Sequence, residues 1–180
     1  MDVLAAHAAR HPEKPALLEG ERVWSWAELI ARRNRLGHGL VDLGLPPGGH
    51  VIVYAENSLE HYLASAAARA AGLIPAPMNH RLVAEEVVYI LDHSDAVAVL
   101  VSDRFLPMVE TVRAQAGKVR QWILLGSQRR PWGVHVDDLL AAGQPDPVEP
   151  RVGEGFGASI IYTGGTTGKP KLIPRTHDDY

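Results

Sequence analysis

Short apolar runs alternate with amphipathic stretches along most of the chain. Four runs have the length of strands and are apolar at nearly every position: His50–Ala55, Leu73–Pro77, Ala96–Val101 and Gln121–Leu125. Such runs are typical of parallel strands, because these are covered on both faces. The stretches between the runs have helical periodicity. This alternation predicts an α/β fold with a mostly parallel sheet flanked by helices.

Turn and cap signals divide the rest of the chain into elements. Ala16–Leu18 and Arg22–Trp24 predict a short antiparallel pair of strands. Ser25 followed by Glu28 has the spacing of a capping box, so a helix should begin there, and Gly44 marks its end. Further helices are expected over Ser58–Ala71, Val83–Leu91, Arg104–Ala116 and Val136–Ala142.

Between Gly126 and Gly157 the chain is rich in proline and glycine and contains only one of these helices. A further apolar run, Ala158–Tyr162, follows directly. We interpret the segment as an irregular connector within one domain, and the run after it as a buried strand.

The composition is that of a soluble globular domain. The 180 residues are 46% hydrophobic and 22% charged, with a net charge of -3 and no cysteine. This balance gives no reason to expect nucleic acid or an anionic membrane as a partner, and it excludes disulfides and thiolate chemistry. The N-terminus lacks a basic, apolar signal segment, and no apolar run approaches the roughly 18 residues that span a bilayer. We therefore expect a cytoplasmic protein.

A loop rich in glycine and threonine follows the last apolar run. It contains Thr163, Gly164, Gly165, Thr166, Thr167, Gly168, Lys169, Pro170 and Lys171. Glycines let consecutive backbone N–H groups converge on an anion, threonines add hydroxyl donors, and Lys171 brings a positive charge to phosphate oxygens. The sequence therefore predicts a phosphate-binding loop at the end of a strand. The alternative is a plain surface turn.

The spacing excludes two other nucleotide motifs. In a P-loop a glycine stands five residues before the Gly-Lys pair, but here Thr163 precedes Gly168 by five, and Pro170 follows Lys169. The glycines of Gly153–Gly157 have the wrong spacing for a dinucleotide fingerprint and precede the strand.

The run Tyr162–Lys171 resembles the signature of the adenylate-forming superfamily, which includes acyl-CoA synthetases, aryl-acid AMP ligases, luciferases and adenylation domains of peptide synthetases. The usual form is Tyr-Thr-Ser-Gly-Thr-Thr-Gly-x-Pro-Lys, and this chain departs from it with Gly164 in place of serine. Gly48–Val53, Gly72–Asn79 and Ala84–Leu91 also resemble the N-terminal part of acyl-CoA synthetases. The resemblance thus covers essentially the whole chain.

The resemblance implies a two-step reaction. A carboxylic acid substrate attacks the α-phosphate of ATP to give acyl-AMP and pyrophosphate, and the thiol of coenzyme A or a carrier pantetheine then takes the acyl group. It also implies that the loop binds the β- and γ-phosphates with Mg²⁺ through Thr163, Gly164, Gly165, Thr166, Thr167, Gly168 and Lys171. His177 matches the Thr-His that often follows the loop. It is expected either to line the nucleotide or acyl site or to cap the next helix.

In this family the other active-site elements follow the loop. The resemblance therefore implies that residues 1–180 form a partial N-terminal domain, truncated just after the phosphate loop and without the small C-terminal domain. We expect this chain to be inactive alone and to self-associate through apolar surface that later elements would cover. The alternative is a non-catalytic nucleotide- or partner-binding module.

Two indications of the substrate disagree. Gly164 and Lys171–Tyr180 resemble aryl-acid AMP ligases of siderophore pathways. Gly72–Leu91 resembles synthetases for fatty or medium-chain acids, and we favour these because that resemblance spans more of the chain.

Other polar residues suggest weaker hypotheses. His7 and His11 are four residues apart on a predicted helix, so they share one face. They are either a metal-binding pair or part of a solvated helix end. Arg32–Arg33 is interpreted as a solvated pair. Asp178–Asp179 is expected to begin a helix rather than to bind metal.

Overall fold

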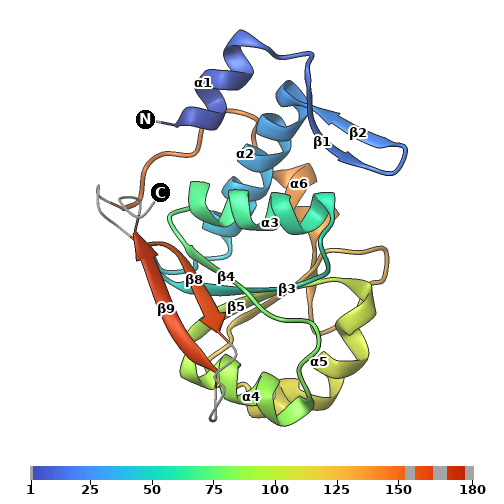
Figure 1. Cartoon of the computed structure of the whole chain (residues 1–180), viewed down its shortest axis with the longest axis vertical. Helices are drawn as coiled ribbons and strands as arrows, with labels where there is room; N and C mark the ends of the chain where they lie inside the picture. Colours follow the sequence, from blue (N-terminus) through green and yellow to red (C-terminus); the bar gives the residue numbers. More distant parts are fainter. Residues whose placement is uncertain (1, 153–156, 164–169, 177–180) are drawn as a thin grey trace.

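The centre of the fold is a five-stranded parallel sheet (Figure 1). The computed structural model describes residues 2–152, 157–163 and 170–176. The sheet has the order β4-β3-β5-β6-β7. Its strands are β3 (His50–Tyr54), β4 (Ile74–Pro77), β5 (Ala96–Val101), β6 (Gln121–Leu124) and β7 (Val134–His135).

Helices cover both faces of this sheet (Figure 1). One face carries α2 (Trp26–Asp42), α3 (Leu59–Ala70) and α6 (Val136–Ala142), and the other carries α4 (Ala84–His93) and α5 (Leu106–Val112). Side chains alternate along each strand, so Val51 and Val53 enter the first core while Ile52 and Tyr54 enter the second. The predicted α/β fold with a parallel sheet flanked by helices is confirmed.

The N-terminal region adds α1 (Val3–Arg10) and an antiparallel pair of strands, β1 (Pro15–Glu19) and β2 (Arg22–Ser25). The capping box is present, since Ser25 Oγ accepts from the Glu28 amide while the Glu28 carboxylate accepts from the Ser25 amide. Gly44 follows the helix with a φ of +70°, a conformation that favours glycine. The predicted antiparallel pair, the capping box and the helix end at Gly44 are therefore confirmed.

The interpretation of Arg33 as solvated is wrong. Its side chain is only 6% exposed, and its Nη1 lies 2.6 Å from Asp2 Oδ2. Its Nε and Nη2 donate to Asn34 Oδ1 at 3.1 and 2.8 Å. Because Asp2 caps α1, this ion pair fastens the first helix to α2.

Three expectations within the sheet layers need correction. The predicted helix over Arg104–Ala116 consists of α5 between two 3₁₀ turns, Asp103–Phe105 and Arg113–Gln115. The expected helix from Val83 begins at Ala84, with Val83 as an exposed N-cap residue. The connector contains the short strand β7, which the sequence did not predict.

The apolar run before the loop does not join the parallel sheet. It forms β8 (Gly157–Thr163), which pairs antiparallel with β9 (Lys171–Thr176) in a separate two-stranded sheet. This hairpin packs beside β4, the edge strand of the parallel sheet (Figure 1). Its cover is incomplete: Ser159 and Ile160 are 6% and 1% exposed, but Ile161 is 38% exposed. The prediction of a buried strand therefore holds at Ser159 and Ile160 but fails at Ile161.

Candidate nucleotide-binding site

The β8–β9 hairpin brings the two ends of the predicted loop together. Thr163, the last residue of β8, is the Cα partner of Lys171, the first residue of β9. Thr163 is half-buried, whereas Lys171 is exposed. A hydroxyl donor and a cation thus stand side by side at one end of the hairpin. The other predicted site residues lie outside the described residues: Gly164, Gly165, Thr166, Thr167, Gly168 and His177.

The inner face of the hairpin is fastened to the core that contains α4 and α5. Ile160 is part of this core, and Tyr162 and Leu172 pack against it. Tyr162 and Leu172 are also cross-strand partners. Since they directly precede Thr163 and follow Lys171, the position of both loop ends depends on how this pair packs.

Tyr162 makes polar contacts at the end of α4 that the sequence did not indicate. Its hydroxyl lies 3.3 Å from His93 Nδ1, and the two rings meet edge to face with centroids 6.2 Å apart. Burial raises the pKa of Tyr162, an effect that a hydrogen bond with the Ser94 side chain opposes. The phenol therefore stays neutral at neutral pH. No local sequence pattern could have revealed this contact, because 69 positions separate Tyr162 from His93.

A cleft lies at the carboxyl ends of the parallel strands. This cleft of about 700 Å³ is lined by residues that follow β3, β5 and β6, among them Glu56, Arg104 and Ser127. Ligands often bind at such an edge, where successive connections leave in opposite directions. Here, however, Arg104 pairs with Glu56, and Arg22 pairs with Glu60. These two guanidinium groups are thus paired with carboxylates of the chain, whereas Arg32, which also lines the cleft, stacks on the ring of Trp24.

Asp103 stabilises the loop at this same edge. Its carboxylate accepts from the backbone amide of Ser127 at 2.8 Å and from that of Gln128 at 3.1 Å. Burial opposes ionisation, but these hydrogen bonds outweigh it, so the pKa of Asp103 lies below its usual value. The charge of Asp103 is thus stabilised by backbone amides of the loop and serves to hold that loop in place.

The histidine pair at the N-terminus packs against an aromatic ring. The rings of His7 and His11 are 5.0 Å apart, and His7 lies 4.5 Å from the ring of Trp26. Among the residues that the structure describes, no group of three or more His, Cys, Asp or Glu side chains is placed to hold a metal ion. Within the same residues, no helix has the length and apolar character needed to cross a membrane.

The chain is similar to known ligases over nearly its whole length. It is 30% identical to the medium-chain-fatty-acid–CoA ligase of Ectopseudomonas oleovorans, over 97% of this chain and 34% of that protein. It superimposes on a solved structure of an anthranilate CoA ligase in complex with anthranoyl-AMP with a TM-score of 0.93 and 25% identity, over 99% of this chain and 34% of the other.

The inhibitor-bound N-terminal domain of FACL13 from Mycobacterium tuberculosis gives a TM-score of 0.85 with 30% identity, over 97% of this chain and 43% of that one. The chain spans about a third of the length of the curated relatives it matches. The family model described as AMP-binding enzyme matches residues 4–180. This chain belongs to the AMP-binding enzyme family.

Proposed function

We propose that this chain is the N-terminal portion of an ATP-dependent ligase that activates carboxylic acids, and that the loop between Thr163 and Lys171 binds the triphosphate of ATP. The observation that carries the proposal is the pairing of these two residues at the end of one hairpin. The hydroxyl at one end of the glycine-rich loop and the ammonium group at the other are both suitable donors to phosphate oxygens.

In this function the loop acts on the leaving group. An oxygen of the carboxylate attacks the α-phosphorus, the bond from that phosphorus to the bridging oxygen breaks, and pyrophosphate leaves with the electron pair. Lys171 and the loop donors would stabilise the charge that develops on the β- and γ-phosphates. Mg²⁺ would arrive as part of the ATP substrate.

The second step transfers the acyl group to a thiol. Sulfur attacks the carbonyl carbon of acyl-AMP, and AMP leaves. We propose coenzyme A or a carrier pantetheine as the acceptor, and the cytoplasm as the compartment that supplies it together with ATP. For the acid we favour a fatty or medium-chain acid, supported by the similarity to the medium-chain-fatty-acid–CoA ligase, with an aryl acid as the alternative.

The outer face of the hairpin indicates where the rest of such a ligase would lie. Ile161 and Ile173 are cross-strand partners, 38% and 45% exposed. They stand two positions from Thr163 and Lys171, so all four side chains project from the same face. A segment that covered the two isoleucines would therefore also border the phosphate site. For residues 1–180 taken alone, we propose that a second copy of the chain associates through this face.

Calorimetry with ATP·Mg²⁺ tests the function. We expect weak binding by the purified chain, no binding to Lys171→Ala, and no binding of AMP, which lacks the β- and γ-phosphates. Equal binding of ATP and AMP would contradict a site for the triphosphate. Because the chain is about one third of a full-length relative, we also expect no acyl-AMP from a mixture of fatty acids. Formation of acyl-AMP would show that the isolated chain is a complete enzyme.

A further inference from the structure

The connection between α4 and β5 lies directly against the hairpin that carries the loop. We propose that this turn, residues His93–Asp95, fixes the position of the two loop ends, Thr163 and Lys171, by holding Tyr162, with His93 as the positioning residue. The inference rests on the proposed function of the loop. The structure describes the turn, Tyr162 and both loop ends, Thr163 and Lys171.

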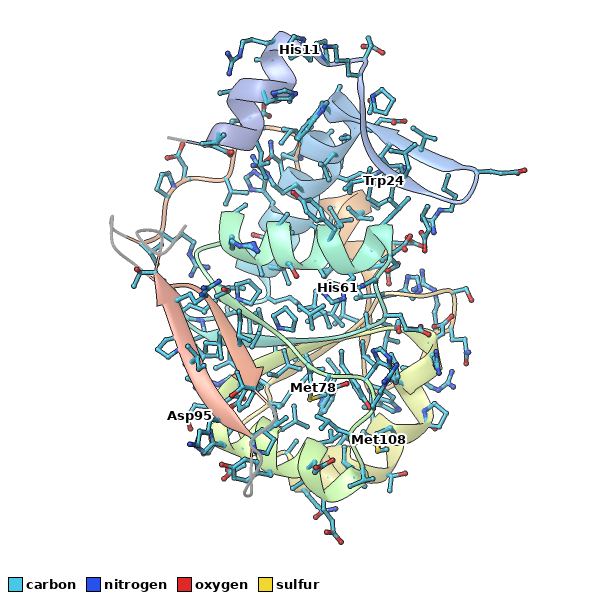
Figure 2. The ribbon with its side chains drawn as sticks, viewed as in Figure 1. His11, Trp24, His61, Met78, Asp95 and Met108 are labelled. Atoms are coloured by element: carbon cyan, nitrogen blue, oxygen red, sulfur yellow. The ribbon has the colours of Figure 1, made fainter. Side chains whose placement is uncertain are left out.

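The turn is bonded to β3 and to Lys118, which lies just before β6. His50 Nδ1, at the start of β3, donates to the carbonyl oxygen of Ser94 at 2.6 Å. Lys118 Nζ lies 2.9 Å from Asp92 Oδ1 and 2.8 Å from Asp95 Oδ1. Asp95, labelled in Figure 2 beside α4, has a φ of +51°, a backbone conformation that aspartate tolerates better than most residues. Contacts on both sides therefore keep this turn in one conformation.

Ser94 and His93 then meet the hairpin from this fixed turn. Ser94 is 1% exposed, and its amide donates to the carbonyl of Ile90 at 2.9 Å. The ring of His93 lies between two tyrosines, with centroid distances of 5.1 Å to Tyr89 and 6.2 Å to Tyr162. The Tyr162 hydroxyl thus reaches His93, which directly precedes the residue whose carbonyl is bonded to β3.

The hairpin needs such support. A two-stranded sheet is marginally stable by itself, and β8–β9 shares no backbone ladder with the parallel sheet. Its inner face is fastened by apolar packing, which resists separation but only weakly resists sliding. The contact of the Tyr162 hydroxyl with His93 adds a directional constraint one residue before Thr163. Small displacements of binding groups can cost large factors in affinity or rate, so this contact would matter at the site itself.

Four variants test the inference. His93→Ala and Tyr162→Phe remove the polar contact, and His93→Gln restores a side chain that can hydrogen-bond to the phenol. His80→Ala is the matched control, because His80 is an exposed histidine whose ring faces Phe105 and not the hairpin. The thermal midpoint of each variant is measured first, to show that the fold is retained.

Hydrogen exchange and nucleotide binding are the readouts. In His93→Ala and Tyr162→Phe we expect faster exchange of the β8 and β9 amides with unchanged exchange in β5, and an affinity for ATP·Mg²⁺ lower by about tenfold. His93→Gln should recover both, and His80→Ala should behave like wild type. Wild-type exchange in β8 and β9 of both His93→Ala and Tyr162→Phe would overturn the inference. If the wild-type chain binds no ATP, the proposed function fails in this chain, while the exchange data still decide whether the turn holds the hairpin.

Discussion

Thr163 and Lys171 face each other as Cα partners at the end of β8 and β9, so the hydroxyl and the ammonium group that flank the loop share one face of the hairpin. The same face carries Ile161 and Ile173, which are also partners. The polar site and the exposed apolar pair are therefore parts of one continuous surface. This arrangement explains how one neighbouring segment could cover the isoleucines and border the phosphates.

Serine substitutions of this apolar pair should reduce self-association. We expect the wild-type chain to show a sedimentation coefficient that rises with concentration. The double variant Ile161→Ser with Ile173→Ser should sediment as a monomer, because burying its outer face no longer removes apolar surface from water. Val83→Ser is the control, since Val83 is more exposed but lies beside α4. A double variant that associates as strongly as wild type would place the contact elsewhere.

The ion pair of Asp2 with Arg33 should contribute measurably to stability. Asp2→Asn keeps an acceptor for the Ala5 amide but leaves the buried guanidinium without its carboxylate. Loss of one partner of a fully buried pair costs roughly 3–5 kcal/mol, and because Asp2 is half-exposed we expect a smaller loss, about 1–2 kcal/mol, in urea unfolding.

The matched control for this pair is Asp138→Asn. It breaks the ion pair with Arg129, in which both side chains are more than half exposed. Such exposed pairs contribute little to stability, because water and salt screen them. An Asp2→Asn variant no less stable than Asp138→Asn would show that Arg33 does not depend on Asp2.

Two glycines should respond differently to the same substitution. A Cβ added at Gly143 would lie 2.0 Å from the backbone oxygen of Arg35, whereas one added at Gly117 would meet nothing within 4 Å. Gly143→Ala should therefore lower the free energy of unfolding by about 1–3 kcal/mol. Gly117→Ala should leave it unchanged or raise it slightly. Equal effects in chemical denaturation would mean that the loop after α6 packs less closely on α2 than the structure shows.

Asp103 should make stability depend on pH in the acid range. Its pKa is lower in the folded state, because the hydrogen bonds from Ser127 and Gln128 outweigh the effect of burial. The stabilisation is therefore fully present above about pH 4, the usual carboxyl pKa, and is lost as the pH falls through the lower folded value. In urea unfolding between pH 7 and pH 3, Asp103→Asn should lose less stability on acidification than wild type. Asp146→Asn, at an exposed site, should follow the wild-type curve.

The parallel sheet was predictable because its signals are local. Strands such as β3 and β5 are apolar at nearly every position, and only burial on both faces produces that pattern. The start of α2 was readable from Ser25 and Glu28, which interact with each other within one turn. The phosphate-binding role of the loop between Thr163 and Lys171 stays a prediction, although its signal is also local, since all its residues lie within one short motif.

Two features that the sequence did not reveal depend on distant partners. The burial of Arg33 depends on Asp2, which lies 31 positions earlier, so its own neighbourhood resembles a solvated helix face. The contact of Tyr162 with His93 exists only after the hairpin has folded against the end of α4. In both cases the deciding contact is tertiary. The strand β9 was missed for a local reason, because it contains Pro174 and two basic residues, which argue against a strand.

Phosphorus NMR of ATP·Mg²⁺ tests the central claim most directly, because it detects weak binding and reports each phosphate separately. On addition of the chain we predict that the β- and γ-phosphate resonances shift and broaden more than the α resonance, and that Lys171→Ala abolishes the change. An unaltered spectrum with the wild-type chain, or the same change with Lys171→Ala, would contradict the assignment of this hairpin as the triphosphate site.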